Sequence, residues 1–231
     1  LTAKALGVEL LIHYGHSCLI PVDRMCGIKV LYIFVDIKID PLHFIETIKL
    51  NFPPKTKMGL VSTIQFVTTL QGVATHLKEL DYDVTLPQFK PLSAGEILGC
   101  TAPVVRCADV LIYLGDGRFH IEAAMIANPK LQAYRYDPYE KKFTREYYDH
   151  QEMKEMRKSS IEKARLAQNI GLIMGTLGRQ GNFKVVEHLR KLLEKLNKNV
   201  MTILLPEVTP DVLDLFTDCN AFVQVACPRL S

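Results

Sequence analysis

The stretch Leu111-Ile-Tyr-Leu-Gly-Asp116 sets the pattern from which this chain is built, because an apolar run ends there in a glycine and a carboxylate. An earlier stretch, Leu11-Ile-His-Tyr-Gly-His16, has the same outline. After each of them a second apolar run ends in an aspartate, at Asp36 and at Asp137. A segment that recurs with its order of elements intact indicates a repeated domain.

Two further pairs of segments extend this repeat. Ser62-Thr-Ile-Gln65 ends one apolar run and opens a helix-like run, and Gly175-Thr-Leu-Gly178 does the same later in the chain. The run 109–114 corresponds in the same way to the run 220–225. Near-continuous apolar runs are typical of strands that are buried on both faces of a parallel sheet. We therefore expect each copy to be an α/β unit with parallel strands.

The repeat predicts an α/β fold of three parallel-sheet domains arranged around a pseudo-threefold axis. Residues 1–54 are expected to form the C-terminal half of the first domain, and residues 55–150 the complete second domain. Residues 151–231 are expected to hold a bridging helix and a third domain, so that the first and third copies are incomplete. The charged run 139–165 is expected to be the bridging helix between the second and third copies.

Apolar runs of strand length predict the strands of these copies. They cover residues 8–14, 30–35, 59–64, 84–87, 110–114, 133–136, 171–174, 201–205 and 221–225. Helical spacing of apolar residues predicts amphipathic helices over 66–80 and 183–196. In the second helix the expected inward-facing stripe consists of Val185, Val186, Leu189, Leu192, Leu193 and Leu196.

The composition excludes several classes of protein. At 231 residues, 48% hydrophobic and 23% charged, the chain should fold into a packed structure. A net charge of +3 argues against a dedicated nucleic-acid binder. The longest apolar run, 28–37, is too short to cross a bilayer and contains Lys29 and Asp36, so we expect no membrane partner. With no visible signal peptide, we expect a cytoplasmic or nuclear protein with reduced cysteines.

Two of the six cysteines are candidates for metal ligands. No two cysteines form a C-x-x-C pair, which argues against a zinc knuckle or a thioredoxin-type motif. Cys100 and Cys227 are each set in a turn-like context, with Gly99 before one and Pro228 after the other. If the copies surround a threefold axis, one cysteine from each would meet at the centre, where three thiolates can hold a [4Fe–4S] cluster. The alternative is that each is a small buried apolar side chain.

Three further segments could carry chemistry. In Gly115-Asp-Gly-Arg-Phe-His120 the glycines allow a ligand to approach the backbone and Arg118 suits a carboxylate or phosphate, although an ordinary turn is the alternative. The segment 175–181 joins a strand to a helix, but it has neither the P-loop nor the dinucleotide-binding glycine pattern. His13 and His16 could bind a metal or transfer protons, although a structural role is the commoner one for histidine.

Seven motifs together resemble the diphthamide-synthesis family, and they occur in the family's order along the whole chain. They are His13-Tyr-Gly-His16, Ser62-Thr-Ile-Gln-Phe66, Leu98-Gly-Cys-Thr101, Gly115-Asp-Gly-Arg-Phe-His120, Tyr134-Arg-Tyr-Asp-Pro138, Gly175-Thr-Leu-Gly-Arg-Gln-Gly181 and Val225-Ala-Cys-Pro-Arg-Leu230.

This resemblance implies three α/β domains, each giving one cysteine to a [4Fe–4S] cluster. Cys100 and Cys227 match the second and third ligands. The implied reaction is a non-standard radical one that uses S-adenosylmethionine (SAM), and it transfers a 3-amino-3-carboxypropyl group to a histidine of translation elongation factor 2. The implied partners are that elongation factor, a paralogous second subunit in a heterodimer, and a small metalloprotein that donates electrons.

With SAM as the implied substrate, placement at strand ends suggests which residues bind it. Arg118, Arg179 and Arg229 are the expected cations for its carboxylate, and the segments after Thr63 and Thr176 are expected to supply backbone hydrogen bonds. The remaining candidates for cofactor binding are Gln65, Gly115, Asp116, Gly175 and Gly178.

The family's first cluster ligand lies in a Tyr-Gly-Ala-Cys segment that this sequence lacks. We therefore expect the chain by itself to hold no complete cluster and to be inactive alone. A non-catalytic partner subunit and a plain α/β small-molecule binding domain remain the alternatives.

Overall fold

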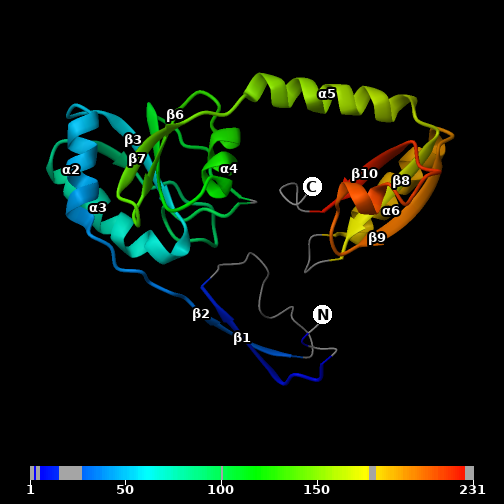
Figure 1. Ribbon diagram of the computed structural model, residues 1–231, viewed down its shortest axis with the longest axis horizontal. Coiled ribbons are helices and arrows are strands. Elements are labelled where there is room, and N and C mark those ends of the chain that lie inside the picture. Colours follow the sequence, from blue (N-terminus) through cyan, green and yellow to red (C-terminus); the bar gives the residue numbers. More distant parts are fainter. Residues whose placement is uncertain (1–2, 4–5, 16–27, 100, 177–180, 227–231) are drawn as a thin grey trace. The chain divides into compact units, whose positions relative to one another are not determined.

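The computed structural model describes residues 3, 6–15, 28–99, 101–176 and 181–226 (Figure 1). The chain divides into two compact units, of which unit 1 covers Leu1–Tyr148 and unit 2 covers Asp149–Ser231. Each unit contains a sheet of mainly parallel strands with helices packed on it, and each is described by itself.

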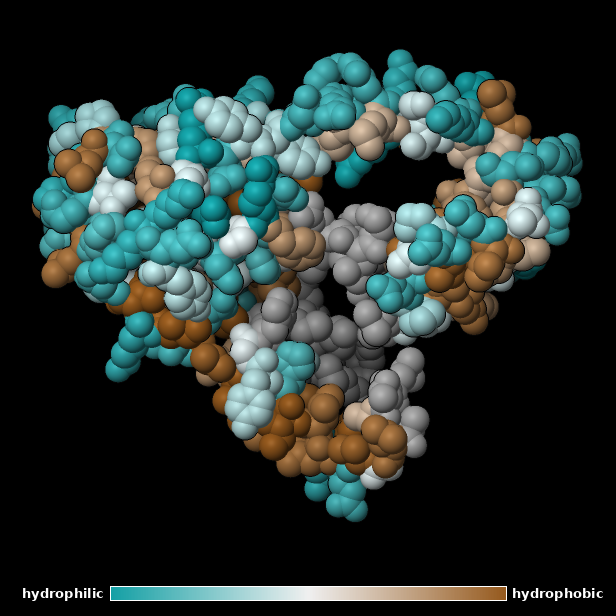
Figure 2. Space-filling model, in the orientation of Figure 1, coloured by the Kyte–Doolittle hydropathy of each residue, from teal (hydrophilic) through white to brown (hydrophobic). Residues whose placement is uncertain are grey.

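Unit 1 contains a small sheet of two parallel strands. These are β1 (Leu10–Tyr14) and β2 (Lys29–Ile33), and their register pairs Leu10 with Lys29 and Tyr14 with Ile33. Many of the apolar side chains of this pair are exposed, including Leu10, Ile12 and Leu31. Figure 2 shows the corresponding apolar surface over β1 and β2.

The main sheet of unit 1 has five strands in the order β4-β3-β5-β6-β7. The strands are β3 (Lys57–Ser62), β4 (Asp83–Thr85), β5 (Val110–Leu114), β6 (Gln132–Asp137) and β7 (Lys142–Glu146). The first four run parallel, and only β7 is antiparallel to its neighbour β6. Every residue of β5 is buried, as expected for the central strand of a parallel sheet.

Helices pack on this sheet and bury its apolar side chains. They are α2 (Pro41–Asn51), the short 3₁₀ helix η2 (Ile64–Phe66), α3 (Val67–Glu79) and α4 (Phe119–Ala127). The start of α2 follows from its sequence, because the Asp40 side chain accepts a hydrogen bond from the N–H of Leu42 and Pro41 takes the first helical position.

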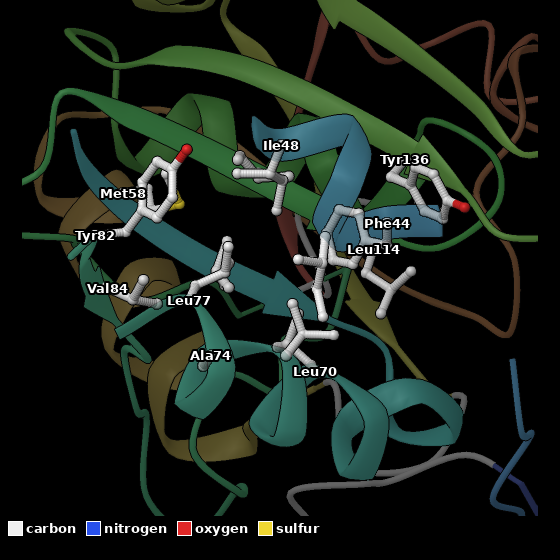
Figure 3. Close-up of a cluster of buried hydrophobic side chains, with 14 of the residues drawn as sticks. Phe44, Ile48, Met58, Leu70, Ala74, Leu77, Tyr82, Val84, Leu114 and Tyr136 are labelled. Carbon is white, nitrogen blue, oxygen red and sulfur yellow. The ribbon is translucent and has the colours of Figure 1, made fainter. Parts of the chain in front are cut away.

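Two clusters of buried side chains form the core of unit 1. The larger contains side chains of α2, α3, β3 and β5, and Figure 3 shows Phe44, Leu70, Leu77, Leu114 and Tyr136 among its members. The smaller is built from Val61, Ile97, Leu111, Tyr113 and Ile121 with their neighbours. Alternate residues of β3 and β5 enter different clusters, as the twofold side-chain period of a strand requires.

Unit 2 is a three-stranded parallel sheet in the order β10-β8-β9. Its elements are α5 (His150–Leu166), β8 (Asn169–Gly175), α6 (Phe183–Lys195), β9 (Asn199–Leu205), α7 (Pro210–Leu213) and β10 (Ala221–Val225). At the start of α6, the Asn182 side chain accepts hydrogen bonds from the N–H groups of Lys184 and Val185. Among its described helices, none is long and apolar enough to span a membrane.

The predicted α/β class with parallel sheets is confirmed, and each predicted strand and helix has a counterpart. Two expectations are wrong in part. The charged run 139–165 is not one helix, because β7 occupies 142–146 and the helix α5 begins only at His150. This run is polar because β7 is an edge strand, whose outer side needs no apolar cover.

The inward stripe expected for α6 is the second error. Of its six residues only Val186 is buried, while Val185, Leu192 and Leu196 are exposed.

The repeat itself is visible in the strand order, since β4-β3-β5 of unit 1 corresponds to β9-β8-β10 of unit 2. The arrangement of the copies around an axis and the three domain ranges stay predictions. The helix α2, which falls within the range 1–54, packs in the core of the five-stranded sheet.

Candidate functional site

The carboxyl ends of β3 and β5 form the candidate site of unit 1. From β3 the chain passes through α3 to β4 on one side of the sheet, and from β5 it passes through α4 to β6 on the other. Such a point of divergence opens a crevice at the carboxyl ends of the strands, where α/β proteins bind ligands. In unit 2, β8 and β10 are likewise adjacent and parallel, and β8 continues through α6 to β9 on the other side of β8.

The segment before Cys100 is joined to the end of β3. Ser62 donates its N–H to the carbonyl of Gly95 at 2.8 Å, and its own carbonyl accepts the N–H of Ile97 at 2.9 Å. This pairing continues the sheet beyond β4, which is paired with β3 only as far as Gly59. The loop therefore runs alongside the strand end as a short added strand.

The two residues that flank Gly99-Cys100 are hydrogen bonded to each other. Leu98 donates to the carbonyl of Thr101 at 3.0 Å, and Thr101 donates back at 3.2 Å. Gly99 lies so close to the ring of Phe119 that any Cβ there would overlap it. Cys100 itself lies outside the described residues. In sequence it follows Gly99, which packs against Phe119, the first residue of α4.

At the end of β5, a buried phenol supports the glycine-rich turn. The Tyr113 hydroxyl donates to the carbonyl of Asp116 at 3.3 Å, and a Cβ on Gly115 would overlap that hydroxyl. Burial, together with the nearby Asp116 carboxylate, raises the pKa of Tyr113 well above its ordinary value. The phenol therefore keeps its proton and remains a hydrogen-bond donor. Gly115 and Asp116, both predicted to bind cofactor, lie at this turn, and Asp116 is exposed.

Arg118 is held by groups of its own unit. Its guanidinium lies 3.4 Å from a carboxylate oxygen of Glu122 and 3.5 Å from one of Glu146, and it donates to the carbonyl of Tyr147 at 2.9 Å. Glu146 is buried and also pairs with Arg135 at 3.2 Å. A ligand carboxylate would have to compete with these partners, and the assignment of Arg118 to such a carboxylate stays a prediction.

Several polar atoms near strand ends are buried without a hydrogen-bond partner. In unit 1 these are Ser62 Oγ, Thr63 Oγ1 and Glu96 Oε1, together with His13 Nε2 on β1. In unit 2 the corresponding atom is Gln224 Nε2 on β10. His13, Tyr113 and Gln224 are each the last but one residue of their strand, so the copies present a polar side chain at the same position.

Sequence reasoning had singled out His13 and Thr63 but missed Ser62, Glu96 and Tyr113. Ser93-x-x-Glu96 was the available signal, since that spacing often closes a turn by reciprocal hydrogen bonds. Gln65, also predicted to bind cofactor, uses its carbonyl to accept the N–H of Ile37 at 2.9 Å.

The end of β8 carries the candidate residues of unit 2. Thr176 donates its N–H to the carbonyl of Leu205 at 2.9 Å, which fixes the start of the loop beside β9. A Cβ on Gly181 would overlap the carbonyl of Gly175, so the end of this loop returns to the strand. The other candidates in this unit, Gly178, Arg179, Cys227 and Arg229, lie outside the described residues.

The described cysteines do not make a metal site. Cys107 is exposed, and Cys219 is half-buried, where burial and then Asp218 raise the pKa of its thiol. Within the described ranges, His, Cys, Asp and Glu side chains form no group of three that could hold a metal ion.

Comparison with known proteins identifies relatives of the whole chain. The family model for the diphthamide synthesis protein matches residues 1–231. A relative from Nematostella vectensis, named 2-(3-amino-3-carboxypropyl)histidine synthase subunit 1, is 59% identical over 230 residues, which cover 100% of this chain and 49% of the relative. The human protein of the same name is 54% identical over 232 residues, covering 100% and 53%. The chain thus spans about half the length of these curated relatives.

Solved structures show the same fold. The crystal structure of Dph2 from Pyrococcus horikoshii with a 4Fe-4S cluster matches with a TM-score of 0.78 at 24% sequence identity, covering 99% of this chain and 67% of that one. A second crystal structure of Dph2 from the same organism also gives a TM-score of 0.78.

Proposed function

Because the chain belongs to the diphthamide synthesis protein family, we propose that it acts in the first step of diphthamide biosynthesis. That step is the transfer of a 3-amino-3-carboxypropyl group from SAM to a histidine of translation elongation factor 2. The observation that carries the proposal is the 59% identity, over the full length of this chain, to a relative named as the synthase of that modified histidine.

The cysteines fit a [4Fe–4S] cluster by their chemistry and by their place in the chain. Cys100 follows the turn that is paired with the end of β3, and Cys227 comes two residues after the end of β10. Both therefore follow segments at the carboxyl ends of adjacent-strand pairs, where ligands bind. When bound, a reduced cluster with one open iron supplies the electron that cleaves the Cγ–S bond of SAM.

The protein's own part is to bind and orient the substrate. The Tyr113 hydroxyl donates to the carbonyl of Asp116 and packs against Gly115, and these contacts fix the backbone of the turn at the end of β5. Thr63 and Thr176 open the loops at the ends of β3 and β8, and their backbone is proposed to bind SAM. Arg118, Arg179 and Arg229 are the proposed partners for its carboxylate.

The proposed partners follow from the same chemistry. Elongation factor 2 supplies the acceptor histidine, and a small metalloprotein supplies the electron. The relatives are named subunit 1, which supports a complex with a second, paralogous subunit.

The proposal is tested with the full-length protein and its partner subunit under anaerobic conditions. Purified elongation factor 2 and SAM are added with a reductant, and mass spectrometry measures the modified histidine. Cys100→Ser and Cys227→Ser are expected to abolish transfer and to lower the iron content. The matched control Cys107→Ser, which changes an exposed cysteine of the same unit, should leave both unchanged. Full transfer by both cysteine variants would instead favour a non-catalytic partner subunit.

A further inference from the structure

Glu96 is a buried carboxylate of which only one oxygen is engaged. The residue is 2% exposed. Its Oε2 accepts a hydrogen bond from the N–H of Ser93 at 3.0 Å, while Oε1 is enclosed without a hydrogen-bond partner. None of the ion pairs in the described part of the chain involves Glu96. A carboxylate shut away from water in this way is unfavourable unless a donor or a cation meets it.

Ser62 is paired with Glu96, and its side-chain oxygen is likewise buried without a hydrogen-bond partner. The two residues are partners in a parallel bridge, so their side chains lie on the same face of the sheet. Ser62 is completely buried, and its Oγ has no hydrogen-bond partner. A carboxylate oxygen and a hydroxyl, both able to accept a hydrogen bond, are therefore buried on one face of the sheet without a partner.

That place is at the carboxyl ends of β3 and β5, where parallel α/β sheets bind their ligands. Ser62 is the last residue of β3, beside Leu114 at the end of β5. The helices that follow β3 begin here, and neither η2 nor α3 has a side-chain cap. Because water is excluded, an interaction between Glu96 and a cation would be stronger than at the surface.

We propose that Glu96 and Ser62 bind the ammonium group of the amino-acid part of SAM. This rests on the proposed function, because SAM is the substrate that brings such a group to the site. A primary ammonium has three N–H donors and matches a carboxylate oxygen and a hydroxyl acceptor side by side. The nitrogen belongs to the fragment that is transferred, so these contacts hold that fragment while its Cγ remains free to react.

The test compares the binding of two ligands to the full-length protein with its cluster reconstituted. The ligands are SAM and the analogue that lacks the α-amino group, and calorimetry under anaerobic conditions measures both affinities. Glu96→Gln keeps an acceptor for the N–H of Ser93 but removes the charge. We expect this variant to bind SAM about 10- to 100-fold more weakly and the desamino analogue with unchanged affinity. Ser62→Ala should have a smaller effect in the same direction.

The outcomes separate this inference from the proposed function. Glu79→Gln is the matched control, since Glu79 is an exposed carboxylate at the end of α3 and should change neither affinity. If Glu96→Gln lowered the affinity for both ligands equally, Glu96 would only stabilise its turn. If it lowered neither affinity, Glu96 would not bind the ammonium group. Either result overturns the inference while leaving the proposed function in place. Failure of the unaltered protein to bind SAM would overturn both.

Discussion

The two larger sheets of this protein have the same order of central strands but differ in how deeply they are buried. In unit 1, β5 is buried along its whole length, and α3 buries Val67, Leu70, Val73, Ala74 and Leu77. In unit 2, β9 exposes Met201 and Leu204, and α6 buries only Val186. The two helices are equally long and each follows the first strand of its sheet.

This difference shows that the order of helices and strands and the burial of their side chains have different causes. Local patterns, such as strand-length apolar runs and a helix start after a loop, fix the order of elements in both units. Burial depends on what lies against each face, and only unit 1 contains a large enclosed core in the described part of the chain. Corresponding positions in the two units should therefore respond differently to the same substitution.

The largest expected difference is between Leu77 and Leu193, which are the eleventh residues of α3 and α6. Leu77 is completely buried, whereas Leu193 is only half-buried. Leu77→Ala should cost about 3 kcal/mol, because the cavity adds to the lost transfer energy. Leu193→Ala should cost about 1 kcal/mol. Hydrogen exchange resolved along the chain measures the two local stabilities. Equal costs would contradict the difference in burial described above.

The glycines at the strand ends provide the next comparison. A Cβ on Gly99 would overlap the Phe119 ring, and one on Gly181 would overlap the carbonyl of Gly175. Each substitution by alanine should cost about 1–3 kcal/mol, and Gly99→Ala should also lower the iron content by displacing the neighbouring Cys100. Gly72→Ala is the control, because nothing lies within 4 Å of its added Cβ and alanine favours the helix. Iron analysis and thermal unfolding measure these effects. If Gly99→Ala kept full iron, the turn would not position the thiol.

The smallest expected effect concerns the starts of the two helices. Asn182 caps α6 through two backbone N–H groups, whereas α3 has no side-chain cap at Phe66. Asn182→Ala should destabilise α6 by about 1 kcal/mol. Because α6 buries so little, the loss should appear as faster hydrogen exchange across the whole helix. The conservative variant Asn182→Asp should keep the amides of α6 protected from exchange. If they stayed protected in Asn182→Ala as well, packing rather than the cap would stabilise the helix.

The sequence predicts the architecture well because parallel strands need continuous apolar runs, as in Val110–Leu114. The family resemblance read from the motifs is confirmed by the family match over residues 1–231. β7 could not be predicted, since Lys142–Glu146 looks like part of a charged helix and becomes a strand only through its pairing with β6. The exposure of the α6 stripe was equally hidden, because periodicity shows which residues share a face and not what covers it.

The candidate site was predictable only where a residue type suggests its chemistry. Cysteines, arginines and glycines next to strand ends could be singled out, and the assignments to them stay predictions. The buried, half-satisfied carboxylate of Glu96 could not be found, because its burial depends on the pairing of the loop with Ser62.

The short pairing of β4 with β3 has a consequence for how this protein could change in evolution. Because β4 leaves the strand at Gly59, residues 95–97 take its place beside Ser62. An insertion or deletion within 86–92 would change the connection between the two partners of β3, including the hydrogen bond from the Gly95 N–H to the Pro87 carbonyl, but would leave the register of Ser62 with Glu96 intact. The same change within 95–99 would shift the register of the paired segment and turn its side chains to the opposite face of the sheet. Length variation among relatives should therefore stop abruptly at the point where the loop joins the sheet.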